Sequence, residues 1–292
     1  MEIYIGNIFR PPSEANSVIL QVTVGCSHNK CTFCGMYKDK VFQIRPLKEV
    51  KEIINFFKLN YPFAEKVFLA DGDALSAPTE YLIEVIKMLK NSFPRLKKIS
   101  SYAGPKSLLT KSVEELHLLR EHGISLLYLG LESGSDTVLK KVQKGFTAEE
   151  IINGCQKAKE ANFELSITVI SGLGGKELWQ EHALSSAEVV SKISPHFLAT
   201  LTLMLVPGTK LFKDAEENRF QLLSSQEILQ ELKLFLQNLN LSNTVFRSNH
   251  ASNYLPLRGV LNQDRAKLIK IIDEALEEKG IWPLRPEYLR RL

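Results

Sequence analysis

Apolar, strand-like runs alternate with amphipathic helical patterns along most of the chain. The runs are nearly continuous in Val, Ile and Leu, which is typical of parallel strands in a covered sheet. We predict strands at 18–24, 66–70, 97–103, 124–131, 163–170 and 196–206. We predict helices at 46–59, 79–91, 112–122, 147–161, 178–193, 225–239 and 263–278. Six βα units in series, each with a right-handed crossover, indicate an α/β fold of the partial (β/α)6, TIM-like barrel kind.

The domain organisation follows from this order. The 292 residues, 44% of them hydrophobic, are enough for one large α/β domain. We expect an N-terminal segment at 1–16, a barrel core at 17–212, and a helical C-terminal extension at 213–292 that closes the barrel.

Three of the four cysteines lie within nine residues, directly after the first predicted strand. Cys26, Cys31 and Cys34 have the spacing Cys-x4-Cys-x2-Cys. Three thiolates on one loop can hold three irons of a cubane [4Fe–4S] cluster and leave the fourth iron open for another ligand. A zinc site is the alternative, because these cysteines and His28 form a plausible Cys3His set.

Polar or glycine-rich residues follow nearly every predicted strand. In parallel barrels the active site gathers at the carboxyl ends of the strands. These ends carry the cysteine loop, Asp71-Gly72-Asp73, Tyr102 to Pro105, Gly130 to Ser135, Ser171 to Gly175, and Pro207-Gly208-Thr209. A zinc-stabilised binding module has no need of such a ring, whereas a cofactor site facing a cluster does.

The cysteine loop resembles the signature of the radical S-adenosylmethionine (radical SAM) superfamily. The family's usual spacing is Cys-x3-Cys-x2-Cys with an aromatic residue before the third cysteine. Phe33 matches that aromatic, but the first gap here holds four residues. The resemblance implies a [4Fe–4S] cluster held by Cys26, Cys31 and Cys34, with S-adenosyl-L-methionine (SAM) on the open iron.

Further motifs carry the resemblance over residues 17–212. Asp71, Gly72 and Asp73 stand where the family has a Gly-Gly-Glu motif that receives the SAM ammonium group; an acidic turn that caps a helix is the alternative. Glu132 and Ser133 match the Gly-x-Glu-Ser motif of the branch with coproporphyrinogen dehydrogenase, the methylthiotransferases and the Elongator catalytic subunit, whose glutamate hydrogen-bonds SAM.

Two more strand ends match the family at the adenine of SAM. Ser171 and Gly172 resemble the glycine-bearing end of strand five, although any βα turn can use glycine. Leu205 and Pro207, in Leu-Val-Pro-Gly-Thr, resemble the end of strand six. The family's chemistry then implies reductive cleavage of SAM to a 5′-deoxyadenosyl radical, with reduced flavodoxin or ferredoxin as the electron donor.

The candidate substrate residues are less specific. Tyr37, Arg45 and Tyr102 lie near the predicted active end, with a surface ion pair as the alternative for Arg45. In the extension, Asn249, His250, Asn253 and Tyr254 form a polar stretch that either contacts substrate or is an ordinary loop. His117, His122 and His182 are interpreted as solvent or packing residues, Cys155 as a buried apolar residue, and the basic tail from Arg285 to Arg291 as a solvated face.

The composition of the chain, and the motifs that it lacks, narrow the class of substrate that we expect. The net charge is +4, so a nucleic-acid partner is not expected. We expect no membrane span, and the clustered cysteines indicate a reducing cytoplasm. No appended domain or second cysteine group is apparent, so we expect a small nucleoside-, nucleotide- or base-like substrate. A lyase that frees queuine in queuosine salvage is a specific candidate. A tRNA-modifying radical SAM enzyme and a zinc-stabilised binding module remain the alternatives.

Overall fold

The computed structural model describes residues 2–277 and 283–291, in two compact units. The first unit comprises Met1–Asn29, Met36–Leu129 and Asn153–Leu165. The second comprises Lys30–Gly35, Gly130–Ile152 and Ser166–Leu292. Glu278, the predicted last residue of the C-terminal helix, lies outside the described residues.

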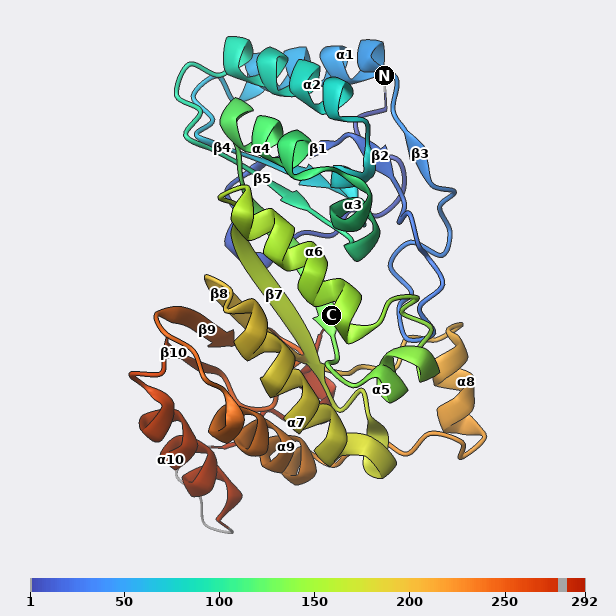
Figure 1. The fold of residues 1–292 in the computed structure, drawn as a ribbon. Helices are drawn as coiled ribbons and strands as arrows, with labels where there is room; N and C mark the ends of the chain where they lie inside the picture. The colour runs from blue at the N-terminus through green and yellow to red at the C-terminus, as the bar shows by residue number, and fades with distance from the viewer. Residues whose placement is uncertain (1, 278–282, 292) are drawn as a thin grey trace. The chain divides into compact units, whose positions relative to one another are not determined.

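The first unit contains a parallel sheet of four strands. Its strands, in spatial order, are β1 (Val18–Gln21), β4 (Lys66–Ala70), β5 (Lys98–Tyr102) and β6 (Ile124–Glu132, of which the last three residues belong to the second unit). The helices between them are α1 (Leu47–Asn60), α2 (Thr79–Ser92), α3 (Pro105–Thr110) and α4 (Val113–His122). Helix α2 packs beside both α1 and α4 (Figure 1). Each long helix therefore buries its apolar stripe against a neighbour, as an amphipathic sequence requires.

Aromatic side chains of three neighbouring strands meet in the first unit. Phe68 lies edge-on to Tyr102, with ring centroids 4.9 Å apart, and Tyr128 is the register partner of Tyr102. The Tyr128 hydroxyl donates to Glu14, in the 3-10 helix η1 (Pro12–Glu14), over 2.6 Å. The predicted N-terminal segment is therefore attached to the sheet through a buried hydrogen bond.

The second unit contains the remaining strands of the main sheet. They are β7 (Glu164–Ser171, from Ser166 onward), β8 (Phe197–Thr202), β9 (Thr244–Ser248) and β10 (Leu257–Leu261). Strands β7, β8 and β9 are parallel, and β10 pairs antiparallel with β9. The helices are α5 (Asp136–Lys141), α7 (Gly175–Ile193), α8 (Lys210–Glu216), α9 (Ser225–Asn238) and α10 (Arg265–Leu276), while α6 (Ala148–Glu160) has residues in both units. Helix α9 lies between α7 and α10 (Figure 1).

The predicted strands and long helices are confirmed, with corrections at the first strand and at the C-terminus. The first strand divides into β1 and a short strand β2 (Thr23–Val24), which lies in a separate sheet. The extension after residue 212 is not purely helical, because it also supplies β9 and β10. Arg247 and Ser248, predicted in a polar loop, are the last residues of β9. The sixth predicted strand ends at Thr202 rather than at 206. Helices α3, α5 and α8 were not predicted, because six or seven residues are too few to show a clear amphipathic period.

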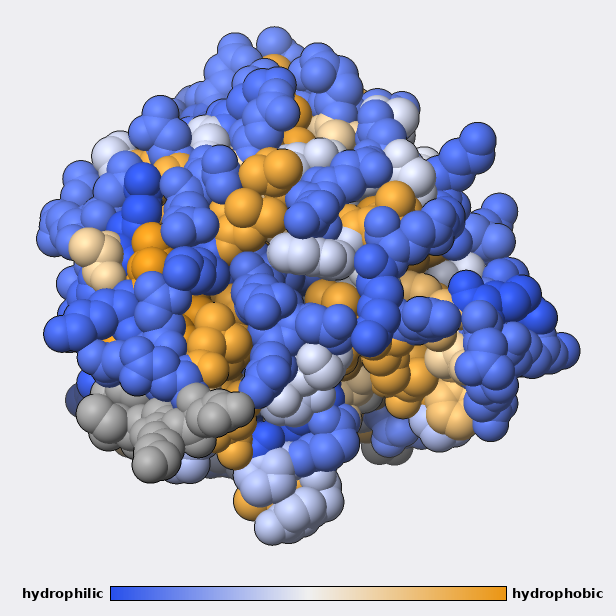
Figure 2. Space-filling model, turned by 90° about the horizontal axis from the view of Figure 1, so that it is seen from below, coloured by the Kyte–Doolittle hydropathy of each residue, from blue (hydrophilic) through white to orange (hydrophobic). Residues whose placement is uncertain are grey.

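The surface of the molecule carries both hydrophobic and hydrophilic residues. Seen from below, the molecule shows hydrophobic residues in separate patches among hydrophilic ones (Figure 2). Within the described ranges, no helix combines the length and apolar character needed to cross a bilayer.

Candidate functional site

The cysteine loop begins and ends at a short β-ladder in the first unit. Strand β2 (Thr23–Val24) pairs antiparallel with β3 (Gln43–Ile44). This pairing brings the two ends of the loop from Gly25 to Phe42 together. Asn29 adopts a left-handed φ of 46° and donates from its amide to the Tyr37 carbonyl over 2.7 Å. The first turn of the loop is therefore fixed by its own side chains.

Asp71 anchors the entry to this loop. Its fully buried carboxylate accepts hydrogen bonds from the Gly25 amide at 2.7 Å and from the Gln21 side chain at 2.9 Å. The buried Lys40 ammonium lies 3.1 Å away and supplies the opposite charge. These contacts explain how a carboxylate can be buried here, since an unpaired one would be costly.

Gly72 and Asp73 hold the next two residues of the loop. The Gly72 amide donates to the Gly25 carbonyl, and a Cβ on Gly72 would lie 2.6 Å from the Cβ of Cys26. Only glycine permits this approach. Asp73 accepts from the Ser27 hydroxyl at 2.7 Å, and also from Ser107 and the Gly104 amide. Burial raises the Asp73 pKa, and these hydrogen bonds oppose that rise.

The second half of the cysteine loop is held within the second unit. The Thr32 amide donates to the Val142 carbonyl, and the Thr32 carbonyl accepts from the Leu211 amide, both at 2.9 Å. Phe33 packs against the hydrophobic cluster that contains Val142 and Leu211. Backbone hydrogen bonds from the residue after α5 and from α8 thus fix Thr32, one of the two residues between Cys31 and Cys34.

The Gly-x-Glu-Ser segment ends β6 with an unusual conformation. Glu132 has a left-handed φ of 66°, and its carboxylate accepts from Lys144 at 3.0 Å. A Cβ on Gly130 would overlap the Glu132 carboxylate, so the glycine makes room for the folded-back side chain. The side chains of this ion pair are 12% and 14% exposed, so it is mostly buried at the strand end.

Ser133 belongs to a buried polar group that was not predicted. Its hydroxyl lies 2.8 Å from Nδ1 of His182 on α7. His182 was interpreted as a solvent or packing residue; it is 1% exposed and hydrogen-bonded. Nearby, Glu231 on α9 accepts from the Gly172 amide at 2.8 Å. The structure therefore brings the predicted residues Ser133 and Gly172 close to one pair of ionisable side chains.

The sequence does contain a signal that Glu231 is a buried polar residue. Helix α9 has a buried stripe of Ile228, Leu232 and Phe235, and Glu231 falls on it. A carboxylate in an apolar stripe needs a partner. Nothing in the helical period, however, indicates that the partner is the Gly172 amide.

The other predicted adenine-flanking residues lie in the second unit. Ser171 is buried, and its carbonyl accepts from the Leu203 amide at 2.9 Å, just beyond β8. Leu205 packs against the hydrophobic cluster around Val142, and Pro207 is exposed. Thr209 closes this turn by capping α8.

The candidate substrate residues near the loop have structural partners. Tyr37 is buried against Phe9, with ring centroids 5.6 Å apart. Arg45 donates to the carbonyls of Glu2 and Ile3 and lies 3.3 Å from Glu49. Its guanidinium thus fastens the N-terminal segment and forms an ion pair, the alternative given for it above. Tyr102 remains half-buried in the aromatic cluster.

The polar stretch in the extension is organised by the C-terminal tail. Asn253 accepts from Thr202 at 2.9 Å, and Arg290 donates to the Ser252 carbonyl at 2.6 Å and to the Tyr254 hydroxyl at 2.7 Å. Asn249 is exposed and His250 is half-buried. The interpretation of the basic tail as a solvated face is wrong for Arg290, which is 4% exposed.

Arg285 belongs to the same arrangement, since it donates to the carbonyls of His250, Ala251 and Asn253. Other predictions for single residues are confirmed. His117 and His122 are on the surface, and Cys155 is fully buried, which raises the pKa of its thiol to about 12.

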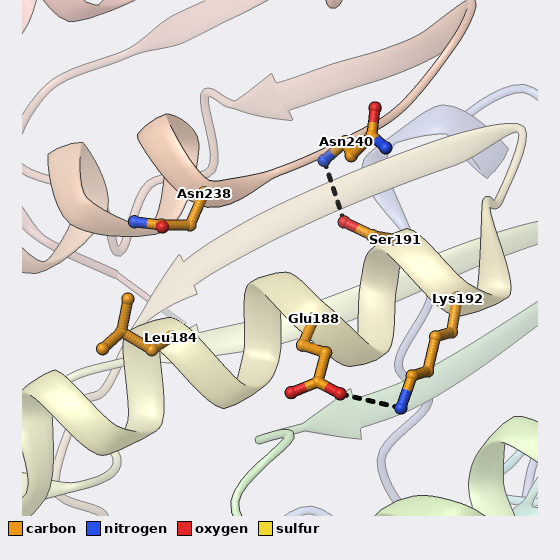
Figure 3. Close-up of a pocket in the computed structure, with 6 residues that line it drawn as sticks. All are labelled: Leu184, Glu188, Ser191, Lys192, Asn238 and Asn240. Carbon is orange, nitrogen blue, oxygen red and sulfur yellow. Dashed lines mark hydrogen bonds and ion pairs between the residues drawn. The ribbon is translucent and has the colours of Figure 1, made fainter.

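Two surface hollows lie apart from the cysteine ligands. One lies between α7 and the end of α9, where Asn240 donates to Ser191 and Lys192 pairs with Glu188 (Figure 3). It contains none of the predicted site residues. The other, of about 580 Å³, is lined by Val142 and Leu211, which hold Thr32, and also by charged residues such as Lys141 and Asp214.

The donor chemistry fits an iron–sulfur cluster. Cys26, Cys31 and Cys34 form no disulfide and are partly exposed, and cysteine thiolates are the usual ligands of such a cluster. In the described part of the chain, no three His, Cys, Asp or Glu side chains gather as a metal site.

Solved structures share the fold of this chain. Coproporphyrinogen III oxidase (HemN) from Escherichia coli, described as a radical SAM enzyme, aligns with a TM-score of 0.56 at 20% identity, covering 76% of this chain and 52% of that one. Methylornithine synthase (PylB) aligns with a TM-score of 0.54 at 20% identity, covering 92% and 84%. The predicted α/β fold of the partial-barrel kind is thereby confirmed.

Curated relatives and a family model give the family. The heme chaperone HemW of Bacillus subtilis is 25% identical over 205 residues, which are 68% of this chain and 53% of that protein. A putative methylthiotransferase of Methanocaldococcus jannaschii is 27% identical over 161 residues, 51% of this chain and 34% of that protein. The chain spans about half the length of the HemW proteins it matches. The model of the radical SAM superfamily, whose members use a [4Fe–4S] cluster and SAM, matches residues 20–185, more than half of the 292 residues. The chain therefore belongs to the radical SAM superfamily.

Proposed function

We propose that this protein is a radical SAM enzyme that abstracts hydrogen from a small nucleoside-, nucleotide- or base-like metabolite. The supporting observation is a loop with three partly exposed cysteines that form no disulfide, held at Gly25 and at Thr32, in a chain of this family. When bound, the cluster and SAM supply reductive cleavage to methionine and a 5′-deoxyadenosyl radical. Cys26, Cys31 and Cys34 would hold the cluster, and reduced flavodoxin or ferredoxin would donate the electron.

The protein's own residues would bind and orient SAM. Glu132 would accept hydrogen bonds from the ribose or amino group, because its carboxylate stands at the open end of β6. Phe33, Ser133, Ser171, Gly172, Leu205 and Pro207 would flank the adenosyl part.

The side chains of Asp71 and Asp73 are not proposed as the groups that receive the SAM ammonium. The carboxylates of Asp71 and Asp73 already accept five hydrogen bonds and one ion pair from the protein. We infer that this segment offers backbone carbonyls to the SAM ammonium, while its side chains hold the cysteine loop.

The substrate class is argued from polar and aromatic side chains. Tyr102, Asn249, His250, Asn253 and Tyr254 offer aromatic and hydrogen-bonding groups that suit a base or a ribose. A queuosine-salvage lyase that releases queuine is the specific candidate. Incubating the loaded enzyme with SAM, dithionite and a panel of nucleosides, followed by mass spectrometry, would detect the product. If no nucleoside or free base raises 5′-deoxyadenosine formation above background, this substrate class is wrong.

Two other functions are favoured by the names of relatives. One relative, from Orientia tsutsugamushi, is a tRNA-2-methylthio-N(6)-dimethylallyladenosine synthase, and two are heme chaperones. Binding of tRNA with a steep salt dependence would favour the first. Stoichiometric binding of hemin by the purified protein would favour the second.

The experiment for the reaction class uses anaerobic reconstitution with iron and sulfide. We expect a brown protein with about four irons per chain, which releases 5′-deoxyadenosine from SAM in the presence of dithionite. The Cys31→Ala variant should lose both properties, whereas Cys155→Ala should retain them. A colourless protein with one bound zinc and no 5′-deoxyadenosine would support the zinc module instead.

A further inference from the structure

A layer of buried polar side chains lies behind two strand ends of the second unit. Helix α7 contributes His182, and α9 contributes Glu231; they are 1% and 2% exposed. Their partners are Ser133, at the end of β6, and Gly172, in the turn after β7. Neither helix residue belongs to a motif of the strand ends, and nothing in the proposed reaction uses them directly.

His182 connects the β6 end with β7. Its Nδ1 lies 2.8 Å from the Ser133 hydroxyl, and its ring also hydrogen-bonds the backbone of Ile170. The Ser133 oxygen already accepts from the Ser135 amide at 3.0 Å, so its proton is available for Nδ1. His182 therefore links Ser133 to β7 through the two hydrogen bonds of one buried imidazole. Burial favours the neutral form of this ring, because it lowers the His182 pKa to about 4.

Glu231 secures the turn after β7. One carboxyl oxygen accepts from the Gly172 amide at 2.8 Å, and the other is buried with no hydrogen-bond partner. His182 Nε2 is 3.8 Å from Glu231, too far for a hydrogen bond. Burial raises the Glu231 pKa to about 8, so the carboxyl group is largely neutral at pH 7. Its contribution is consequently a hydrogen bond to a buried amide rather than a charge.

Close packing makes this layer rigid. The Gly134 amide donates to Ser186 on α7 at 2.8 Å, and a Cβ on Gly134 would overlap the backbone of Ser185. Ser135 donates to Glu181, one residue before His182. On the other side, Ile228, one helical turn before Glu231, would meet any Cβ on Gly172 at 2.7 Å. The two strand ends are thus seated directly on α7 and α9.

We propose that His182 and Glu231 are positioning residues that fix the Glu132-Ser133 end and the Ser171-Gly172 turn in the arrangement that binds the adenosyl part of SAM. The inference rests on the proposed function. A site held by supporting hydrogen bonds binds its ligand at a lower cost in conformational entropy than a mobile one. Loss of either support should weaken SAM binding while leaving the cysteine loop intact.

The test compares removal with isosteric replacement. Glu231→Ala and His182→Ala remove the supports, whereas Glu231→Gln keeps a neutral acceptor of the same shape for the Gly172 amide. Thr244→Val is the control for stability alone, because the fully buried Thr244 hydroxyl donates to the Pro195 carbonyl, away from both strand ends. Three quantities are measured for each protein: iron content, the KM and kcat for SAM cleavage, and the affinity of the cluster-free protein for S-adenosylhomocysteine.

We expect the two alanine variants to raise KM for SAM and the dissociation constant of S-adenosylhomocysteine by about tenfold, as loss of one buried hydrogen bond allows. Their iron content and kcat at saturating SAM should stay near wild type. Glu231→Gln should restore both constants to within about threefold, and Thr244→Val should change the melting temperature only.

The results that would overturn the inference alone differ from the result that would overturn the proposed function as well. If Glu231→Ala lowers the melting temperature as Thr244→Val does but leaves both constants unchanged, the residues are merely structural and the inference fails alone. Failure of Glu231→Gln to restore binding would also overturn it. A wild-type protein that holds its cluster but neither binds nor cleaves SAM would overturn the proposed function and the inference together.

Discussion

At the scale of single residues, the acidic motif after β4 shows how a short sequence can serve a neighbouring loop. Asp71, Gly72 and Asp73 contact Gly25, Cys26 and Ser27 in the same order along the chain. Each contact uses a different device, namely a charge-assisted hydrogen bond, a missing Cβ, and a hydroxyl donor. These contacts fix the backbone around the first cysteine.

Gly130 offers a residue-scale prediction. In the Gly130→Ala variant the new Cβ would displace only the flexible end of the Glu132 side chain, which would leave Lys144. We expect a change in unfolding free energy below about 1 kcal/mol and a clear rise in KM for SAM. Gly134→Ala is the matched control, since it meets backbone and should destabilise the fold by more than about 2 kcal/mol. Unchanged KM in Gly130→Ala would remove Glu132 from the site.

Glu231 and His182 give a pH dependence with a defined sign. Burial raises the Glu231 pKa from 4.5 to about 8, so the folded state binds more protons than the unfolded state between these values, and stability falls as pH rises through them. The His182 pKa is lowered from 6.5 to about 4, so its contribution increases stability over that lower range and is complete above about pH 6.5.

Between pH 6.5 and 8, therefore, Glu231 alone of this pair changes stability. We expect wild type to lose on the order of 1–2 kcal/mol relative to Glu231→Gln over this interval, measured by urea unfolding at each pH. Parallel curves for the two proteins would show that Glu231 is ionised throughout.

At the scale of elements, the hydrophobic period of the sequence was enough to predict most of the strands and the long helices. The apolar runs of β4 and β7 and the amphipathic period of α1 and α9 were sufficient for the strands and long helices. The strand-end motifs were also visible, because parallel strands place their carboxyl ends on one edge.

Other elements could not be predicted for physical reasons. Strands β9 and β10 form only because β8 offers an edge to pair with, and α5 and α8 are too short for a periodic signal. The partners of Asp71, Glu231 and Arg290 depend on approaches between segments distant in the chain. Local sequence contains no record of those approaches.

The C-terminal tail gives a prediction at this scale. Arg290 donates to the carbonyls of Ser252 and Leu203 and stacks on Tyr254, with 4.3 Å from its guanidinium carbon to the ring centroid. Arg290→Ala should therefore destabilise the protein by about 2–4 kcal/mol and speed amide hydrogen exchange at 250–254. Arg291→Ala, at an exposed position, is the control and should change neither. Unchanged exchange in Arg290→Ala would mean that the tail does not organise this loop.

At the scale of the whole molecule, each of the two units holds a different part of the cysteine loop and of the strand-end motifs. The first unit fixes Cys26, and the second unit fixes Thr32 between Cys31 and Cys34 and supports Glu132, Ser133 and Gly172. The central claim is that three cysteines leave one iron open and that SAM binds there.

Electron paramagnetic resonance of the reconstituted, dithionite-reduced protein tests this claim most directly, with spectra recorded before and after addition of SAM. We predict the signal of a reduced [4Fe–4S] cluster whose line shape changes when SAM is added, and no such signal from Cys34→Ala. A cluster signal that SAM leaves unchanged, or a wild-type protein without any cluster signal, would contradict the account.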